Sequence, residues 1–183
     1  MATKATATKK TTDRKVSAEK ILSRYVEFVL DNGHEPATVY SLCKDLKINE
    51  KEFYRHFGSL AGVHKAVWKN IVEKTAGICR EDTKFDEFSA REKLLAYYYT
   101  LVESLSEYRT FVLWSLNSGK KIEPEPSVLS EAKKEFMSFC QEIIISGLET
   151  EEIIDRPLIG KRYKEGMWVQ FLFVVQFWRK DDS

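Results

Sequence analysis

The sequence predicts an all-α protein, in which an N-terminal three-helix helix-turn-helix domain is joined by a long helix to a C-terminal helical bundle. Three observations predict this class. Apolar residues recur at steps of three and four along most of the 183 residues, which is the period of helices with one buried face. Gly and Pro, which break helices, are scarce, with 8 and 4 residues respectively. Side chains that can cap a helix stand directly before the apolar runs.

Four short polar residues mark where the N-terminal helices begin. Ser17 can cap a first helix, which ends at Asp31-Asn32-Gly33 because Gly and Asn accept the left-handed geometry of a helix C-terminus. The other candidate caps are Thr38, Asn49 and Ser59, each followed by apolar residues at helical spacing. Three short helices bury little surface alone, so we expect the fourth helix, after Ser59, to complete their core.

Helical spacing continues through the second half of the chain. Two prolines make the segment 120–127 the best candidate for an exposed loop. The expected elements are a charged break at 80–86, helices over 88–104 and 111–116, a long helix over 128–148, a short helix or turn at 149–156, and a last helix from residue 158 or 161 to 179.

The last helix is apolar in nearly every direction. Between Met167 and Trp178 its only polar residues are Gln170 and Gln176. A helix of this kind is buried on more than one side, whereas this apolar run is too short to cross a bilayer. We expect one face to pack in its own subunit and the other to meet a partner; burial within the monomer alone is the alternative.

The order of residues from Gly33 onward resembles the N-terminal domain of the TetR family of bacterial transcriptional regulators. The family has a Gly closing the first helix, a Thr opening the second, a Leu-Tyr-x-Tyr-Phe run in the third and a Ser opening the fourth. This chain has Gly33, Thr38, Phe53-Tyr54-Arg55-His56-Phe57 and Ser59, without a gap or insertion. The resemblance covers roughly residues 15 to 75 and implies a domain that binds DNA.

Three features depart from the family pattern. Lys47 stands where the family has the Gly of the turn, which costs strain if the position needs a positive φ. Leu60 replaces a basic residue that contacts a phosphate in the family. Glu50 and Glu52 lie on the recognition helix, where Glu52 fits a capping box or could accept a hydrogen bond from cytosine.

The resemblance implies double-stranded DNA with a pseudo-palindromic operator as the partner. The distribution of charge favours the same partner, because residues 1 to 75 hold 14 Lys and Arg against 9 Asp and Glu, whereas residues 76 to 183 hold 15 against 19. Part of the excess lies in residues 1–14, an expected disordered basic tail that either reaches phosphates or only aids solubility. The expected DNA contacts are Thr38, Lys47, Asn49, Lys51, Glu52, Tyr54, Arg55 and His56.

The family resemblance also implies that residues 76–183 bind a ligand and form a dimer. In the family, the helical bundle holds a pocket for an apolar inducer, and the last two long helices pair between subunits. Rings at helical spacing equally serve as simple core. The candidate pocket residues are Tyr98, Phe111, Trp114 and Trp168. The expected dimer contacts are Phe136, Phe139, Ile143, Trp168, Phe171, Val175 and Trp178.

Catalysis finds no support in the sequence. His34, His56 and His64 lack metal-ligand spacing, and no phosphate loop or nucleophile motif is present, so we expect neither an enzyme nor a metal nor a cofactor. The thiols of Cys43, Cys79 and Cys140 are widely spaced, which together with the absence of an apolar leader favours the cytoplasm.

Two functions follow from the sequence. The first is a dimeric DNA-binding repressor that an unknown apolar small molecule releases from its operator. The alternative is a protein that keeps the TetR-like fold, has lost DNA binding, and binds lipid or a protein partner through its C-terminal helices.

Overall fold

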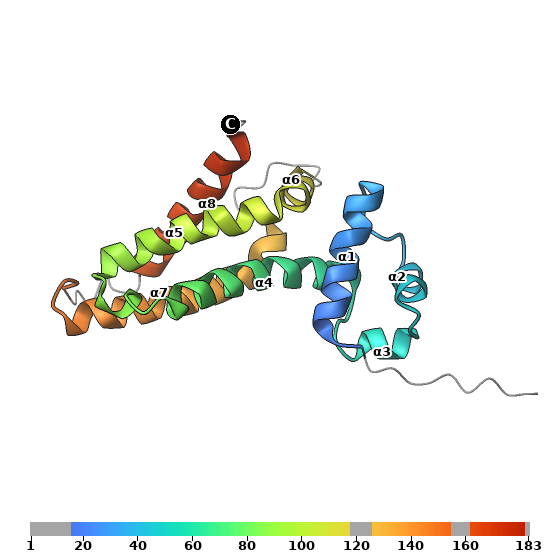
Figure 1. Ribbon diagram of the computed structural model, residues 1–183, viewed down its shortest axis with the longest axis horizontal. Coiled ribbons are helices and arrows are strands. Elements are labelled where there is room, and N and C mark those ends of the chain that lie inside the picture. The colour runs from blue at the N-terminus through green and yellow to red at the C-terminus, as the bar shows by residue number, and fades with distance from the viewer. Residues whose placement is uncertain (1–15, 118–125, 155–161, 182–183) are drawn as a thin grey trace, which may run out of the picture.

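The computed structural model describes residues 16–117, 126–154 and 162–181, and within these ranges every regular element is helical, which confirms the all-α class. Figure 1 shows an elongated molecule with α1–α3, here called the head, at one end and the C-terminal bundle at the other. The long helix α4 runs between them (Figure 1). The helices are α1 (Ala18–Asn32), α2 (Val39–Leu46), α3 (Glu50–Tyr54), α4 (Leu60–Glu81), α5 (Ala90–Glu107), α6 (Arg109–Asn117), α7 (Ser130–Glu149) and α8 (Tyr163–Lys180).

The four predicted caps each begin a helix. The Ser17 hydroxyl accepts a hydrogen bond from the Lys20 N–H at 3.3 Å, and the Ser59 hydroxyl accepts one from the Gly62 N–H at 3.1 Å. Gly33 ends α1 with φ 72°, the left-handed geometry expected from its sequence. Local side-chain chemistry therefore sets the boundaries of the head helices.

α4 passes through the predicted domain boundary without a break. It runs for 22 residues from Leu60 to Glu81, so the division expected after residue 75 lies inside a helix. Val63 and Trp68 are buried near its first half, and Ala76 and Cys79 are buried near its end. The same helix therefore belongs to the core of the head and to the core of the bundle.

The second half follows the predicted order of elements. A short 3-10 helix, Phe85–Glu87, overlaps the end of the charged break. Ser89 and Glu92 then form a complete capping box at the start of α5. A second 3-10 turn, Ser127–Leu129, leads into α7. The tail 1–14, most of the loop 120–127 and the end of the turn 149–156 lie outside the described residues.

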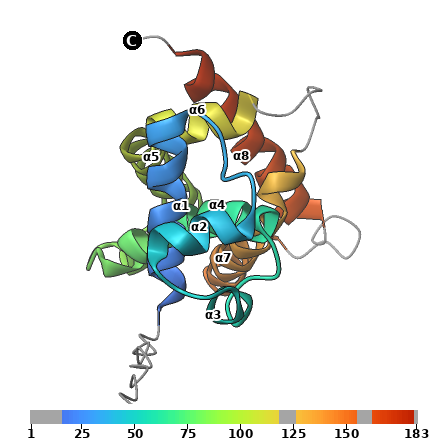
Figure 2. The ribbon, with the colours of Figure 1, turned by 90° about the vertical axis from the view of Figure 1, so that its right-hand side faces the viewer.

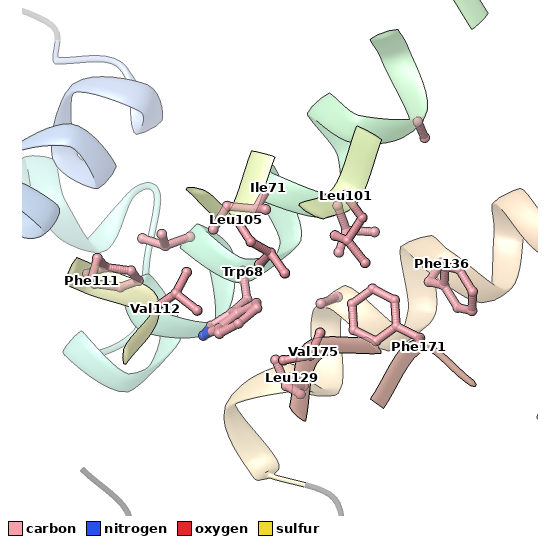
Figure 3. Packing of buried hydrophobic residues seen from close by; sticks show 14 of the residues in the cluster. Trp68, Ile71, Leu101, Leu105, Phe111, Val112, Leu129, Phe136, Phe171 and Val175 are labelled. Carbon is pink, nitrogen blue, oxygen red and sulfur yellow. The ribbon is translucent and has the colours of Figure 1, made fainter. Parts of the chain in front are cut away.

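One hydrophobic core extends through the described residues, from Ile21 in α1 to Trp178 in α8. Figure 3 shows its central part, where Trp68 of α4 lies between side chains of α5, α6 and the start of α7. Since head and bundle share this core, they pack as one continuous body. None of the described helices is long and apolar enough to cross a membrane.

The residues expected at a dimer interface lie inside this core. All seven are at most 6% exposed and pack against helices of their own chain, so a second copy cannot reach them without detaching α8. In the single chain the expected residues of α8 form its inner face, and the apolar pattern continues around the whole helix. The outward stripe of α8 is instead Val169, Phe173 and Phe177, exposed by 64, 68 and 67%.

Candidate nucleic-acid interface

The helix-turn-helix is formed by α2 and α3, which α1 and α4 hold in place. Leu42 and Cys43 of α2 and Phe53 of α3 are buried, so these two short helices are attached through their inner sides. Figure 2 views the molecule from this end, with the helices of the head toward the reader. The opposite sides of α2 and α3 therefore remain available to a partner.

Two of the predicted contact residues serve as helix caps. The Thr38 hydroxyl accepts a hydrogen bond from the Ser41 N–H at 3.1 Å, and the Asn49 Oδ1 atom accepts one from the Glu52 N–H at 2.8 Å. Both residues are exposed, at the first turns of α2 and α3. Each cap places backbone N–H groups and a polar side chain at the same end of a helix.

Lys47 ends α2 in the left-handed conformation, with φ 57° and ψ 38°. The turn thus keeps the geometry that suits a glycine, although a side chain is present. This arrangement costs about 1–2 kcal/mol for an L residue with a Cβ atom. The Lys47 side chain is exposed beside the start of α3.

The outer side of α3 carries the remaining candidates. Lys51, Tyr54, Arg55 and His56 are all exposed, whereas the neighbouring Phe53 is fully buried. Phenol, imidazole, ammonium and guanidinium groups are suited to phosphate oxygens and base edges. These exposed side chains lie on α3 and in the turn that directly follows it.

Glu52 does not belong to that surface. Its residue is only 7% exposed, and its carboxylate accepts a hydrogen bond from the Nη1 atom of Arg55. The Asn49 side of the predicted capping box is present, but the Glu52 carboxylate binds Arg55 instead of the Asn49 N–H group. The structure therefore places the Glu52 carboxylate against Arg55 of its own chain and apart from the exposed candidates.

Tyr40, which is 65% exposed on α2, is not among the residues that the sequence pattern indicated. Helical periodicity could have found it, because Leu42 and Cys43 point inward and residue 40 then points outward. A phenol at this position adds a hydrogen-bonding group and a ring to the exposed side of α2. Tyr40 therefore joins the candidate surface.

The charge on this surface is mixed. From Thr38 to Leu60 the chain has four basic and three acidic residues. Asp45 is engaged by Arg24 of α1, at 3.0 Å between Nη2 and Oδ2. Leu60 is half-buried against the core, so the position of the family's phosphate-binding cation has a packing role here. The surface therefore carries many hydrogen-bonding groups but little net positive charge.

The candidate ligand residues form two separate groups of rings. Phe111 and Trp114 of α6 pack against His64, at 5.6 and 5.2 Å between ring centroids. Tyr98 and Trp168 instead contact Phe136, at 6.3 and 6.0 Å. Figure 3 shows Phe111 and Phe136 at opposite sides of the part of the core that it draws, so the two groups of rings are separate.

A polar junction connects α4 to α6 beside the head. The Ser115 hydroxyl accepts a hydrogen bond from Trp68 Nε1 at 2.8 Å and lies 2.6 Å from His64 Nε2. Burial lowers the pKa of His64 from 6.5 to about 4, because its protonated form would lose hydration. Tyr25 of α1 lies 6.0 Å from the same imidazole, which links the junction to the head.

Comparison with known proteins identifies the other half of the chain. Residues 93–183, which include most of α5 and all of α6 to α8, match the family described as tetracyclin repressor-like, C-terminal domain. No curated protein and no solved structure matches the chain. The family match falls on the bundle, whereas the resemblance found in the sequence falls on the head, so the two observations come from different residues. Together with the all-helical fold, they show that the chain belongs to the TetR family of regulators.

Proposed function

We propose that the protein is a DNA-binding transcriptional regulator that acts as a dimeric repressor in the cytoplasm. The observation that carries the proposal is the exposure of seven of the eight expected DNA contacts around α2 and α3. Their neighbours Leu42 and Phe53 are fully buried, so the exposed residues are presented by a fixed backbone. Membership of the TetR family supports the same partner, double-stranded DNA.

A dimer would place two heads on one pseudo-palindromic operator. The outward stripe of α8 supports this arrangement, since its three apolar residues are about two-thirds exposed in the single chain. Large exposed apolar groups in a row favour association with another protein surface. A two-fold dimer through this stripe would present equivalent α3 helices to successive major grooves, about 34 Å apart.

A small apolar ligand would release the repressor from DNA. The two ring groups give this part of the proposal two candidate positions, one beside His64 and one around Phe136. The group beside His64 contacts both α1 and α6, so a ligand that displaced those rings would act directly on the head. By thermodynamic linkage, the factor by which the ligand lowers the affinity for DNA would equal the factor by which DNA lowers the affinity for the ligand.

A DNA-binding titration tests the proposal. The duplex flanking the protein's own gene and a random duplex of equal length are titrated at several salt concentrations. We expect a saturable complex with the flanking duplex that weakens as salt rises, because bound Lys and Arg release counterions. Equal affinity for both duplexes would contradict the proposal.

The outward stripe of α8 also favours a second candidate function, in which the protein binds lipid or another protein and does not bind DNA. Phe173 and Phe177 stack at 6.4 Å on the exposed side of the helix, where either kind of partner could cover them. Native mass spectrometry of the purified protein separates the two functions. A copurified lipid combined with no DNA selectivity would support this second candidate.

A further inference from the structure

We propose that Glu52 is a positioning residue that holds the Arg55 guanidinium for sequence-selective contact with a base. The inference rests on the proposed DNA-binding function and deepens it. It concerns one ion pair on the recognition helix, between a buried carboxylate and an exposed cation. Glu52 itself touches no base in this proposal; it acts through Arg55.

The backbone around Glu52 is fixed from two sides. Its N–H group donates to the Oδ1 atom of Asn49 at 2.8 Å, and the next residue, Phe53, is fully buried in the core. The Glu52 side chain is 9% exposed, so little water reaches the carboxylate. A carboxylate removed from water needs a charged or hydrogen-bonded partner, and Arg55 supplies it. Glu52 is therefore a rigid acceptor.

Arg55 differs from Glu52 in its exposure. Its side chain is 51% exposed, and its Nη1 atom is the group bonded to Glu52 Oε2. A guanidinium has five N–H donors in one plane, so a bond at Nη1 restrains the group and leaves donors on Nε and Nη2. Fixed, planar donors are what bidentate recognition of guanine O6 and N7 requires.

The same pairing makes Arg55 a poor residue for binding phosphate. The negative charge of Glu52 cancels the positive charge of Arg55 locally, so the pair adds no net charge to the surface. Affinity for DNA of any sequence depends on net cations that replace counterions. We therefore infer that the pair contributes to the choice of sequence and that Lys51, which is also exposed on α3, contributes to general affinity.

Glu50 provides a matched control on the same helix. It is an exposed carboxylate two residues from Glu52, and the structure gives it no ion pair within the described residues. Both Glu50→Gln and Glu52→Gln remove one negative charge from the recognition helix while they keep the side-chain shape. The two variants therefore have equal effects on net charge and differ in their effect on Arg55.

The experiment measures the affinity of the full chain for a duplex selected from a randomised pool and for an unrelated duplex. We expect both variants to bind the unrelated duplex more tightly than wild type, because each loses one negative charge. In Glu52→Gln the ratio of selected to unrelated affinity falls by roughly tenfold or more, in line with the loss of one bidentate base contact. In Glu50→Gln this ratio stays within about twofold of the wild-type ratio.

Two Arg55 variants complete the test. Arg55→Ala lowers the ratio as Glu52→Gln does, and the double variant loses no more than Arg55→Ala alone, because the two residues act through one contact. Arg55→Lys keeps the charge and a partner for Glu52 but loses the planar fork, so it lowers the ratio even if Glu52→Gln does not fold.

Three outcomes would overturn the inference. Equal ratios for Glu52→Gln and Glu50→Gln would remove the positioning role while the DNA-binding function stands. A fall in both affinities together, with a lower melting temperature, would make Glu52 a purely structural residue. If wild type itself selects no sequence from the pool, the proposed function and this inference fall together.

Discussion

Lys47 has a backbone conformation that is unfavourable for a residue with a Cβ atom. Its φ of 57° lies in the left-handed region that suits glycine. We predict that Lys47→Gly raises the free energy of unfolding by about 0.5–1 kcal/mol, because relief of strain exceeds the added entropy of the unfolded chain. Urea denaturation measures the change. Lys51→Gly, inside α3, is the control and lowers the same free energy by about 1 kcal/mol.

His64 makes stability depend on pH. Its pKa is about 4 in the folded chain and 6.5 in the unfolded chain, so between these values only the unfolded chain takes up the proton. The free energy of unfolding therefore falls as pH falls from 6.5 to 4, by at most about 3 kcal/mol. Denaturation curves of wild type and His64→Gln at several pH values test this prediction.

The difference in pH dependence between wild type and His64→Gln isolates the contribution of the histidine. Hydrogen bonds from Ser89 and Lys134 lower the carboxyl pKa values of Glu92 and Glu131. The folded protein therefore also loses the stabilising contribution of these two carboxylates when acid protonates them. Both are present in the variant and cancel in the comparison. A pH dependence that is the same with and without His64 would show that its imidazole stays solvated.

Among the helices, α8 presents the clearest contrast between its two sides. Trp168 and Phe171 are buried in the chain, while Phe173 is 68% exposed. We predict that Phe173→Ser weakens the proposed dimer at least tenfold, because burial of each phenylalanine contributes about 2 kcal/mol. Sedimentation over a range of concentrations measures this change. Ile145→Ser, on the 46% exposed surface of α7, is the control and leaves the dimer intact.

The same helices show what could be predicted from the sequence. Helix starts depend on neighbouring residues, so Ser17, Thr38, Asn49 and Ser59 were identified correctly as caps. The inner face of α8 could not be identified, because apolar residues surround the helix and the distinction depends on contacts with α5 and α7. Periodicity predicts a buried face only where polar residues mark the other face.

The candidate site was predictable to a similar extent. The register of the helix-turn-helix placed seven of the eight expected contact residues on the exposed surface, because local spacing determines which side of a short helix faces outward. The burial of Glu52 depends on how α3 packs and on the position of Arg55. The separation of Phe111 from Phe136 likewise depends on contacts between distant segments, which the sequence pattern does not contain.

At the scale of the whole molecule, the shared core predicts a single unfolding transition. The four tryptophans, Trp68, Trp114, Trp168 and Trp178, lie in α4, α6 and α8, so their fluorescence reports the bundle and its junction with the head. Hydrogen exchange of α1 and α2 reports the head. We expect the two probes to give the same denaturation midpoint, because the described core is continuous. A lower midpoint for the head would show that it unfolds independently.

The unbroken run of α4 has a mechanical consequence. Its 22 residues form a rod about 33 Å long, anchored in the bundle at one end and in the head at the other. If this rod pivots by about 6° in the bundle, its far end moves about 3.4 Å, which equals the rise of one base pair. In the proposed dimer on DNA, a rotation of this size would therefore shift a head by one step along the DNA helix.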